Sequence, residues 1–162
     1  MRYIQIVLVL LLFFTLSKLQ AQDYQTALGL RIGPSYGITV KHFLKSNAAI
    51  EGILQTRRGG FNLIGLYEFH GTAFQTRGLK YFIGGGAHIG NWDGKNGYPW
   101  YSNKDDDGNF IAFGIDGIIG LEYTFIDAPV NLALDWKPAF NLIEHTGFWG
   151  DELAFTVRFT FK

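Results

Sequence analysis

The sequence lacks several features that commonly stabilise or direct a protein. It has no cysteine, so no disulfide can stabilise it, and a small exported domain would need another source of stability. Its 14 basic residues balance its 14 acidic residues, which argues against a nucleic acid partner. No apolar run beyond residue 21 reaches the roughly 20 residues of a spanning helix. Glycine, with 21 residues, and aromatic residues, at 17%, are instead plentiful and favour a β-rich domain.

The first 21 residues have the composition of a secretory signal peptide. Arg2 supplies a positive start, Ile4 to Leu16 are almost wholly apolar, and Ala21 offers a small residue at a cleavage site. An inner-membrane anchor is the weaker alternative, because the apolar run is shorter than a spanning helix requires. We expect residues 1–21 to be removed and residues 22–162 to form a single exported domain.

Apolar and polar residues alternate with period two along eight segments of the mature chain. This period gives a strand one apolar and one polar face. In the last segment, for example, Phe155 and Val157 flank Thr156. Segments of this number and length are those of the smallest membrane barrels. We therefore predict an all-β fold, an eight-stranded antiparallel up-and-down transmembrane β-barrel. The segments cover residues 24–32, 36–44, 48–57, 61–71, 79–92, 110–125, 130–137, where Pro138 ends the run or marks a bulge, and 151–162.

The polar faces of these segments carry as many cations as anions. A soluble barrel would turn its apolar face inward and leave these charges in water. In a narrow membrane barrel they would instead pair inside, since an unpaired buried charge is expensive. Small residues on the same face, such as Gly29 and Gly114, leave room for long side chains. We predict a side-chain-filled interior with a charge network of Arg31, Lys41, Glu51, Glu68, Lys80, Asp116, Glu122, Asp135, Lys137 and Arg158.

Aromatic residues gather near both ends of the predicted strands. Membrane interfaces select two such belts, so this distribution supports an apolar face turned toward lipid. One predicted belt contains Trp92, Trp100, Tyr101, Trp136, Phe148 and Trp149, and the other contains Tyr24, Tyr81, Tyr123, Phe125 and Phe161.

The connections differ in length between the two sides of the predicted barrel. Those near residues 45, 72 and 126 are short, as on the periplasmic side of outer-membrane barrels, whereas residues 93–109 and 141–150 form long loops on the other side. In the longer loop, Asn103, Asp105 and Asp107 resemble the start of a calcium loop. Gly114 stands where the bidentate Glu would be needed. They are weak metal candidates, and we expect no cofactor.

Few residues could support catalysis. Ser35, His145 and Glu144 would adjoin if the first and last strands close the barrel, and could then form a nucleophilic triad. His145 is more simply a loop histidine, so we expect no enzyme. His70 and His88 fall on the inward face, where hydrogen bonding to a carboxylate is a simpler role than metal binding.

The chain resembles the small eight-stranded outer-membrane β-barrel proteins of Gram-negative bacteria, of the OmpX and OmpA transmembrane-domain type. The resemblance rests on the apparent cleavage site at Ala21-Gln22, the eight amphipathic segments and the closing strand with Phe159 and Phe161. It implies export through the periplasm and a monomer surrounded by outer-membrane lipid. It also implies that Phe159 and Phe161 form an assembly signal for the barrel-assembly machinery.

The resemblance leaves the role open. It implies a structural or surface-interaction role through the extracellular loops. Two alternatives come from other classes: a secreted, soluble, lipocalin-like barrel that binds an apolar ligand, and a lipid-A-modifying outer-membrane enzyme. The direction in which the apolar face points decides between the first alternative and the membrane barrel.

Overall fold

A computed structural model describes residues 24–93, 109–143 and 146–162. The predicted signal peptide, Glu144, His145 and the loop residues Trp100, Tyr101, Asn103, Asp105 and Asp107 lie outside the described residues. The strands are β1 (Thr26–Ile32), β2 (Tyr36–Lys45), β3 (Ala48–Arg57), β4 (Gly60–Thr72), β5 (Leu79–Asp93), β6 (Asn109–Thr124), β7 (Val130–Trp136), β8 (Ala139–Asn141), β9 (Gly147–Trp149) and β10 (Leu153–Phe161).

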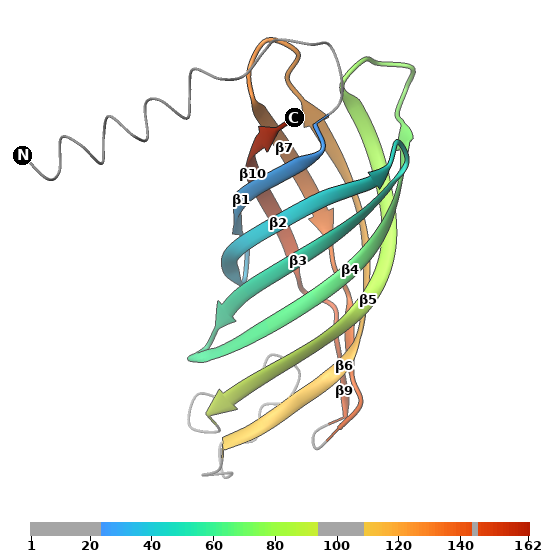
Figure 1. Cartoon of the computed structure of the whole chain (residues 1–162). Helices are drawn as coiled ribbons and strands as arrows, with labels where there is room; N and C mark the ends of the chain where they lie inside the picture. Colours follow the sequence, from blue (N-terminus) through green and yellow to red (C-terminus); the bar gives the residue numbers. More distant parts are fainter. Residues whose placement is uncertain (1–23, 94–108, 144–145) are drawn as a thin grey trace, which may run out of the picture.

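These strands form one antiparallel sheet that closes on itself (Figure 1). Neighbours in chain order pair from β1 to β7, and β10 pairs with both β7 and β1. β8 continues the line of β7, and β10 continues the line of β9. Each of these two pairs counts as one barrel strand, so the ten strands make eight barrel strands. The predicted eight-stranded antiparallel barrel is confirmed. In the described part of the chain, no helix is long and apolar enough to cross a membrane.

The two ends of the barrel differ. At one end, called here the terminal end, β1 begins and β10 finishes (Figure 1). The connections at this end, residues 46–47, 73–78 and 125–129, are short, as predicted. The opposite end, called the loop end, carries the connections after β1, β3, β5 and β8. There the hairpin of β5 and β6 reaches farther than that of β3 and β4 (Figure 1).

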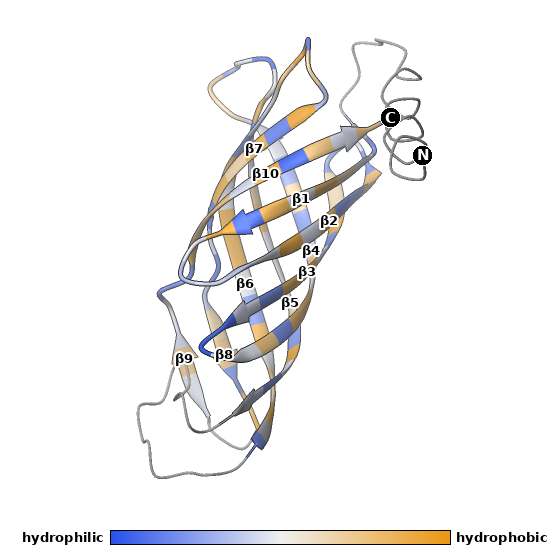
Figure 2. Ribbon diagram, turned by 90° about the vertical axis from the view of Figure 1, so that its left-hand side faces the viewer, coloured by the Kyte–Doolittle hydropathy of each residue, from blue (hydrophilic) through white to orange (hydrophobic). Residues whose placement is uncertain are grey.

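Apolar and polar residues alternate along each strand, which Figure 2 displays as orange and blue segments. The apolar set points outward: Leu30 is 61% exposed, Ile115 54% and Phe155 44%. The charged set points inward, and Lys41 and Glu68 are 0% exposed. The predicted orientation is therefore confirmed, because the apolar residues form the outer wall and the charged residues lie inside.

The last predicted loop is partly wrong, because residues 141–150 contain β9. Pro138 separates β7 from β8, yet the register against β6 stays constant across it. On the other side, the register between β7–β8 and the eighth barrel strand, which consists of β9 and β10, shifts by one residue. Trp136 pairs with Leu153, whereas Ala139 pairs with Trp149. Proline has no N–H for a ladder, and the extra residue on the facing strand forms a bulge there. This bulge changes which residues of the eighth strand point inward.

Candidate functional site

The candidate site predicted from the sequence is a charge network in the barrel interior. In the structure, the predicted residues lie there. All of the ten residues except Lys80 are at most 5% exposed. Lys80 is half-buried near the terminal end, with its Nζ 5.3 Å from the centre of the Phe43 ring. The buried members form two separate groups, one in each half of the barrel.

The group in the terminal half is centred on Lys41. Its Nζ lies 2.7 Å from Glu68, 3.2 Å from Glu51 and 3.4 Å from Glu122. These carboxylates come from β3, β4 and β6, so one ammonium joins strands on different sides of the barrel. A lysine buried completely among three carboxylates is held in place by charge, since no other arrangement would compensate its desolvation.

Arg158 and His70 complete this terminal cluster, which consists of Lys41, Glu51, Glu68, His70, Glu122 and Arg158. The Arg158 guanidinium donates to Glu51 at 2.6 Å and to Asn131 Oδ1 at 3.1 Å, and Thr39 donates to Glu51 as well. His70 lies 3.1 Å from Glu68 and 3.4 Å from Glu122. The cluster therefore connects five strands through charge-assisted bonds.

The second group lies closer to the loop end. Arg31 binds Asp135 with two hydrogen bonds of 2.7 and 2.6 Å, across the strand between them. Asp116 accepts a bond from Lys137 at 3.2 Å and lies 2.7 Å from His88 Nδ1. Both described histidines predicted to face inward thus lie beside carboxylates. Among the described residues, no three His, Asp or Glu side chains gather as metal ligands would.

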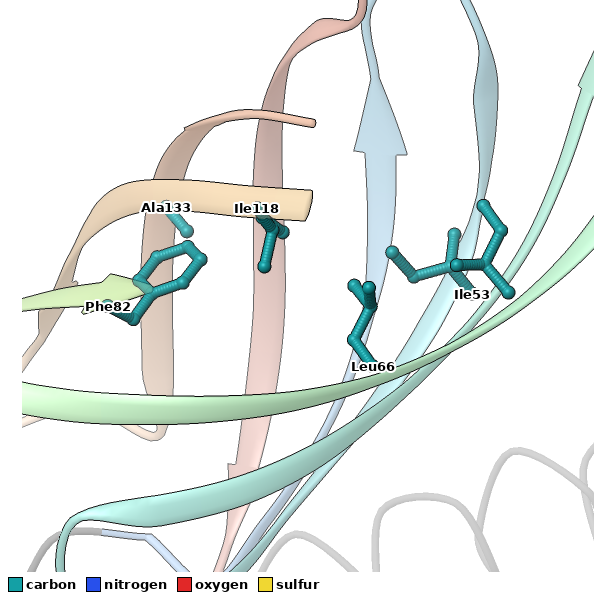
Figure 3. Packing of buried hydrophobic residues seen from close by; sticks show 6 residues of the cluster. Ile53, Leu66, Phe82, Ile118 and Ala133 are labelled. Carbon is teal, nitrogen blue, oxygen red and sulfur yellow. The ribbon is translucent and has the colours of Figure 1, made fainter. Parts of the chain in front are cut away.

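An apolar layer separates the two groups. Its members are not among the predicted interior residues, although they share the inward parity of the charged residues. Figure 3 shows Phe82, Ile118 and Ala133 projecting from one part of the wall toward Leu66 and Ile53. Ile64 belongs to the same cluster. The interior is therefore layered along the barrel axis rather than uniformly polar.

Two tryptophans predicted for a lipid belt instead lie inside the loop end. Trp92 is 1% exposed and Trp149 2%, and their rings meet edge to face at 6.2 Å. Arg57 joins them, because its carbonyl accepts from Trp92 Nε1 at 3.2 Å and its guanidinium lies 5.6 Å from the Trp149 ring. We call Arg57, Trp92 and Trp149 the outer cap. Tyr24 is also buried, 3% exposed, inside the terminal end.

The other predicted belt residues that are described lie on the outer wall. Trp136 and Phe148, near the loop end, are 42% and 60% exposed. Near the terminal end, Tyr81, Phe125 and Phe161 are exposed, and Tyr123 is half-buried. The belt prediction was therefore wrong for three residues: Trp92, which has inward parity, Trp149, which the bulge turns inward, and Tyr24, which precedes β1.

Glu152 is an interior residue that the sequence analysis missed. It is 0% exposed, accepts a hydrogen bond from Ser35 Oγ at 2.8 Å, and lies 3.7 Å from Arg57. Arg57 also binds Asp151 at 2.7 and 2.9 Å at the rim. The hydroxyl of Ser35, a candidate nucleophile, is thus engaged with a carboxylate rather than with a described histidine. Parity does place Glu152 inward, because it is in step with Thr156 and Arg158 of the same strand.

Inward glycines make space for the long interior side chains. A Cβ at Gly29 would come within 2.6 Å of Arg158 Cγ, and one at Gly120 within 2.6 Å of Phe82 Cζ. Carbon atoms cannot approach so closely without displacement. The predicted role of small residues on the polar face is confirmed at these two positions.

Phe159 and Phe161, the predicted assembly signal, lie in the final strand. Their rings contact edge to face at 5.0 Å, and Phe161 is 46% exposed on the outer wall. This places an aromatic pair at the terminal end of β10. Its recognition by an assembly machinery stays a prediction.

Comparisons with known proteins concern the fold. No family model matches the sequence, and no curated protein matches it. The N-terminal β-barrel domain of Pseudomonas aeruginosa OprF superimposes with a TM-score of 0.63 at 15% identity, covering 86% of this chain and 100% of that one. Neisserial surface protein A (NspA) gives 0.51 at 13% identity, covering 84% and 93%. The chain has the fold of the small eight-stranded outer-membrane β-barrels.

Proposed function

We propose that this chain is an integral protein of the bacterial outer membrane, with a structural or surface-interaction role carried by its loop end. The observation that supports it is the inverted distribution of side chains. Outward-facing Leu, Ile, Val and aromatic residues cover the wall of every barrel strand, while Lys41, Arg158 and their carboxylate partners are buried. Such a wall suits acyl chains and would be a very large apolar patch in water.

A soluble barrel with an apolar ligand fits this arrangement poorly. It would need an apolar interior of sufficient size, whereas the interior here holds the ion pairs of the terminal cluster and the Arg31–Asp135 pair. Nothing in the described residues favours a lipid-modifying enzyme either. The two groups of charges and the apolar layer between them support a filled barrel whose interior acts as scaffold.

The loop end is then the surface available for interaction outside the cell. With the connections 46–47, 73–78 and 125–129 in the periplasm, the longest connection, residues 94–108 after β5, lies outside the cell. The apolar wall is continuous around the barrel, so we propose a monomer surrounded by lipid. We also propose that the barrel-assembly machinery reads the aromatic pair Phe159 and Phe161 at the end of β10.

The location is tested by fractionating membranes and analysing the protein on gels with and without boiling. A folded barrel should copurify with outer membranes and shift in mobility when heated. Recovery in the soluble periplasmic or secreted fraction would contradict the proposal.

A matched pair of substitutions tests the lipid-facing wall. Val157, in the middle of β10, pairs with Leu30 and Leu132 and is 41% exposed. V157R should lower the unfolding free energy in lipid vesicles by about 2 to 4 kcal/mol, because a charge near the bilayer midplane is costly. F148R, at the loop end, should cost only about 0 to 1 kcal/mol. Equal effects in a urea titration would argue against a spanning wall.

A further inference from the structure

The connection between β4 and β5, residues 73–78, lies at the terminal end (Figure 1) and consists of two tight turns. The Thr76 N–H donates to the Ala73 carbonyl at 3.0 Å and closes the first turn, and the Leu79 N–H donates to the Thr76 carbonyl at 3.2 Å and closes the second. The Ala73 N–H also donates to the Leu79 carbonyl at 3.0 Å. The conformation of this short connection is therefore held by its own hydrogen bonds.

The first of these turns holds a bulky residue in an unfavourable backbone conformation. Its central residues, Phe74 and Gln75, have φ values of 50° and 53°. Two positive φ values are typical of a type I′ turn, which favours Gly, Asn or Asp, because a larger side chain crowds the backbone there. The turn between β3 and β4 follows this preference in part, since Gly59, with φ 77°, comes after Arg58, with φ 50°. The turn at Phe74 has no glycine at either position.

The Phe74 side chain is also unusually exposed. It is 85% exposed, more than any other large apolar side chain in the described part of the chain. Backbone strain of this kind persists where something else requires it, and an aromatic ring in water gains nothing from its position. Both costs would be offset if an apolar environment outside the chain received the ring.

Two tyrosines of the terminal-end belt flank the connection. Tyr81, on the outer wall, lies across the end of β4, where a Cβ at Gly71 would collide with its ring. Tyr123 lies at the other end of the connection, where a Cβ at Gly78 would be 3.3 Å from its Cε2. The Thr124 N–H donates to the Gly78 carbonyl at 2.9 Å and fixes this contact. The connection therefore continues the outer wall at the level where an aromatic belt indicates the membrane interface.

The charge of the terminal end favours an anionic partner. Arg77 is exposed and occupies the second turn, three residues after Phe74. Counted over the described residues, the exposed charged side chains of this end are the cations Lys45, Arg77 and Lys162 and the anion Asp127. A guanidinium group matches the geometry of a phosphate. A phospholipid headgroup layer offers phosphate to Arg77 and, directly below it, acyl carbon to Phe74.

We propose that residues 73–78 form an interfacial anchor, in which Phe74 inserts among phospholipids beside the terminal end and Arg77 binds a lipid phosphate. This inference rests on the proposed outer-membrane location and extends it to a connection that lies beyond the strands. Phospholipid is the occupant because the anchor is continuous with the lipid-facing wall through Tyr81 and Tyr123 and carries the complementary charge. The turn holds the ring in place before it meets the bilayer.

Fluorine nuclear magnetic resonance tests the position of the ring. A single fluorophenylalanine at position 74 keeps the side chain and labels it alone, and the protein is placed in nanodiscs of phosphatidylglycerol and phosphatidylcholine. A lipid that is spin-labelled high on its acyl chain should broaden the signal, whereas a water-soluble gadolinium chelate should broaden it little. The same label at Phe155, on the outer wall, should respond strongly to the labelled lipid, and at Phe82, which is 0% exposed inside, weakly.

The Phe155 control separates this inference from the proposed function. If Phe155 contacts lipid but the signal at position 74 responds to gadolinium and not to the labelled lipid, the anchor is overturned and the proposed function stands. If Phe155 does not contact lipid either, both proposals fail.

A matched pair of variants tests the part played by Arg77. R77Q should reduce the broadening at position 74 caused by a headgroup-labelled lipid, because the ring loses the phosphate contact that holds it at this depth. K45Q removes another exposed cation of the terminal end, at the close of β2, and should leave the broadening unchanged. Both residues are exposed, so neither change should disturb the barrel. Equal broadening in R77Q and K45Q would overturn the binding of phosphate by Arg77.

Discussion

The terminal half and the loop half of the interior both bury polar groups, but they hold them differently. In the terminal half, every member of the terminal cluster has at least one ion pair or hydrogen bond, and Lys41 alone contacts three carboxylates. In the loop half, Gln55 and Asn62 have no described partner. Because the loop half also contains ion pairs, such as Arg31 with Asp135, the two halves differ in their amides: Asn131 is hydrogen-bonded, whereas Gln55 and Asn62 are buried without a described partner.

The largest effect should follow from removing Lys41. K41M leaves Glu51, Glu68 and Glu122 facing one another without their shared cation, so the unfolding free energy should fall by about 3 to 5 kcal/mol. Urea titration of the refolded barrel measures this. K45M, at the exposed end of the same strand, should change it by less than about 0.5 kcal/mol. A small loss for K41M would mean that the terminal cluster contributes little.

Replacing an interior asparagine with leucine should lower the unfolding free energy more in the terminal half than in the loop half. N131L removes a partner of Arg158 and should cost about 1.5 to 3 kcal/mol, since a bond to a charged group is lost. N62L removes no bond to a described residue and should cost less than about 1 kcal/mol. Similar losses in the same urea assay would erase the distinction between the two halves.

The smallest change in stability should come from opening the outer cap. R57A removes the pair with Asp151 at the rim, worth about 0.2 to 1 kcal/mol, and a longer contact of 3.7 Å with Glu152. It also removes the cation that lies over Trp149. Acrylamide should therefore quench Trp92 and Trp149 more strongly, which is measured in a background where Trp100 and Trp136 are replaced by Phe. Unchanged quenching would show that Arg57 does not hold the cap closed.

Much of the fold could be predicted, because period-two alternation and strand length are local properties. Parity that places Glu51 and Glu68 inside also places Ile53, Leu66 and Trp92 inside, so the apolar layer and Trp92 of the cap could have been predicted from the sequence. Trp92 was assigned to a lipid-facing belt because of its residue type. Its position in the period-two pattern, which points inward, was not used, and the assignment was wrong for this reason.

The contacts between interior side chains could not be predicted from the sequence. The pairing of Arg31 with Asp135, which are 104 positions apart, depends on which strands face each other after closure. Trp149 is out of step with the inward positions of β10 and points inward only because of the bulge opposite Pro138, and no local pattern sets the parity across a bulge. Alternation predicts which residues are inside, whereas closure and irregularities decide which of them meet.

The pairing of β1 with β10 has a consequence for biogenesis. The ribosome makes β10 after every other strand, so β1 waits for its partner until the whole barrel sequence has been made. Until that seam forms, the polypeptide carries two bare hydrogen-bonding edges and an oily surface, a combination prone to aggregation. For the outer-membrane protein proposed above, the barrel could therefore close only after all of its strands had been made and exported.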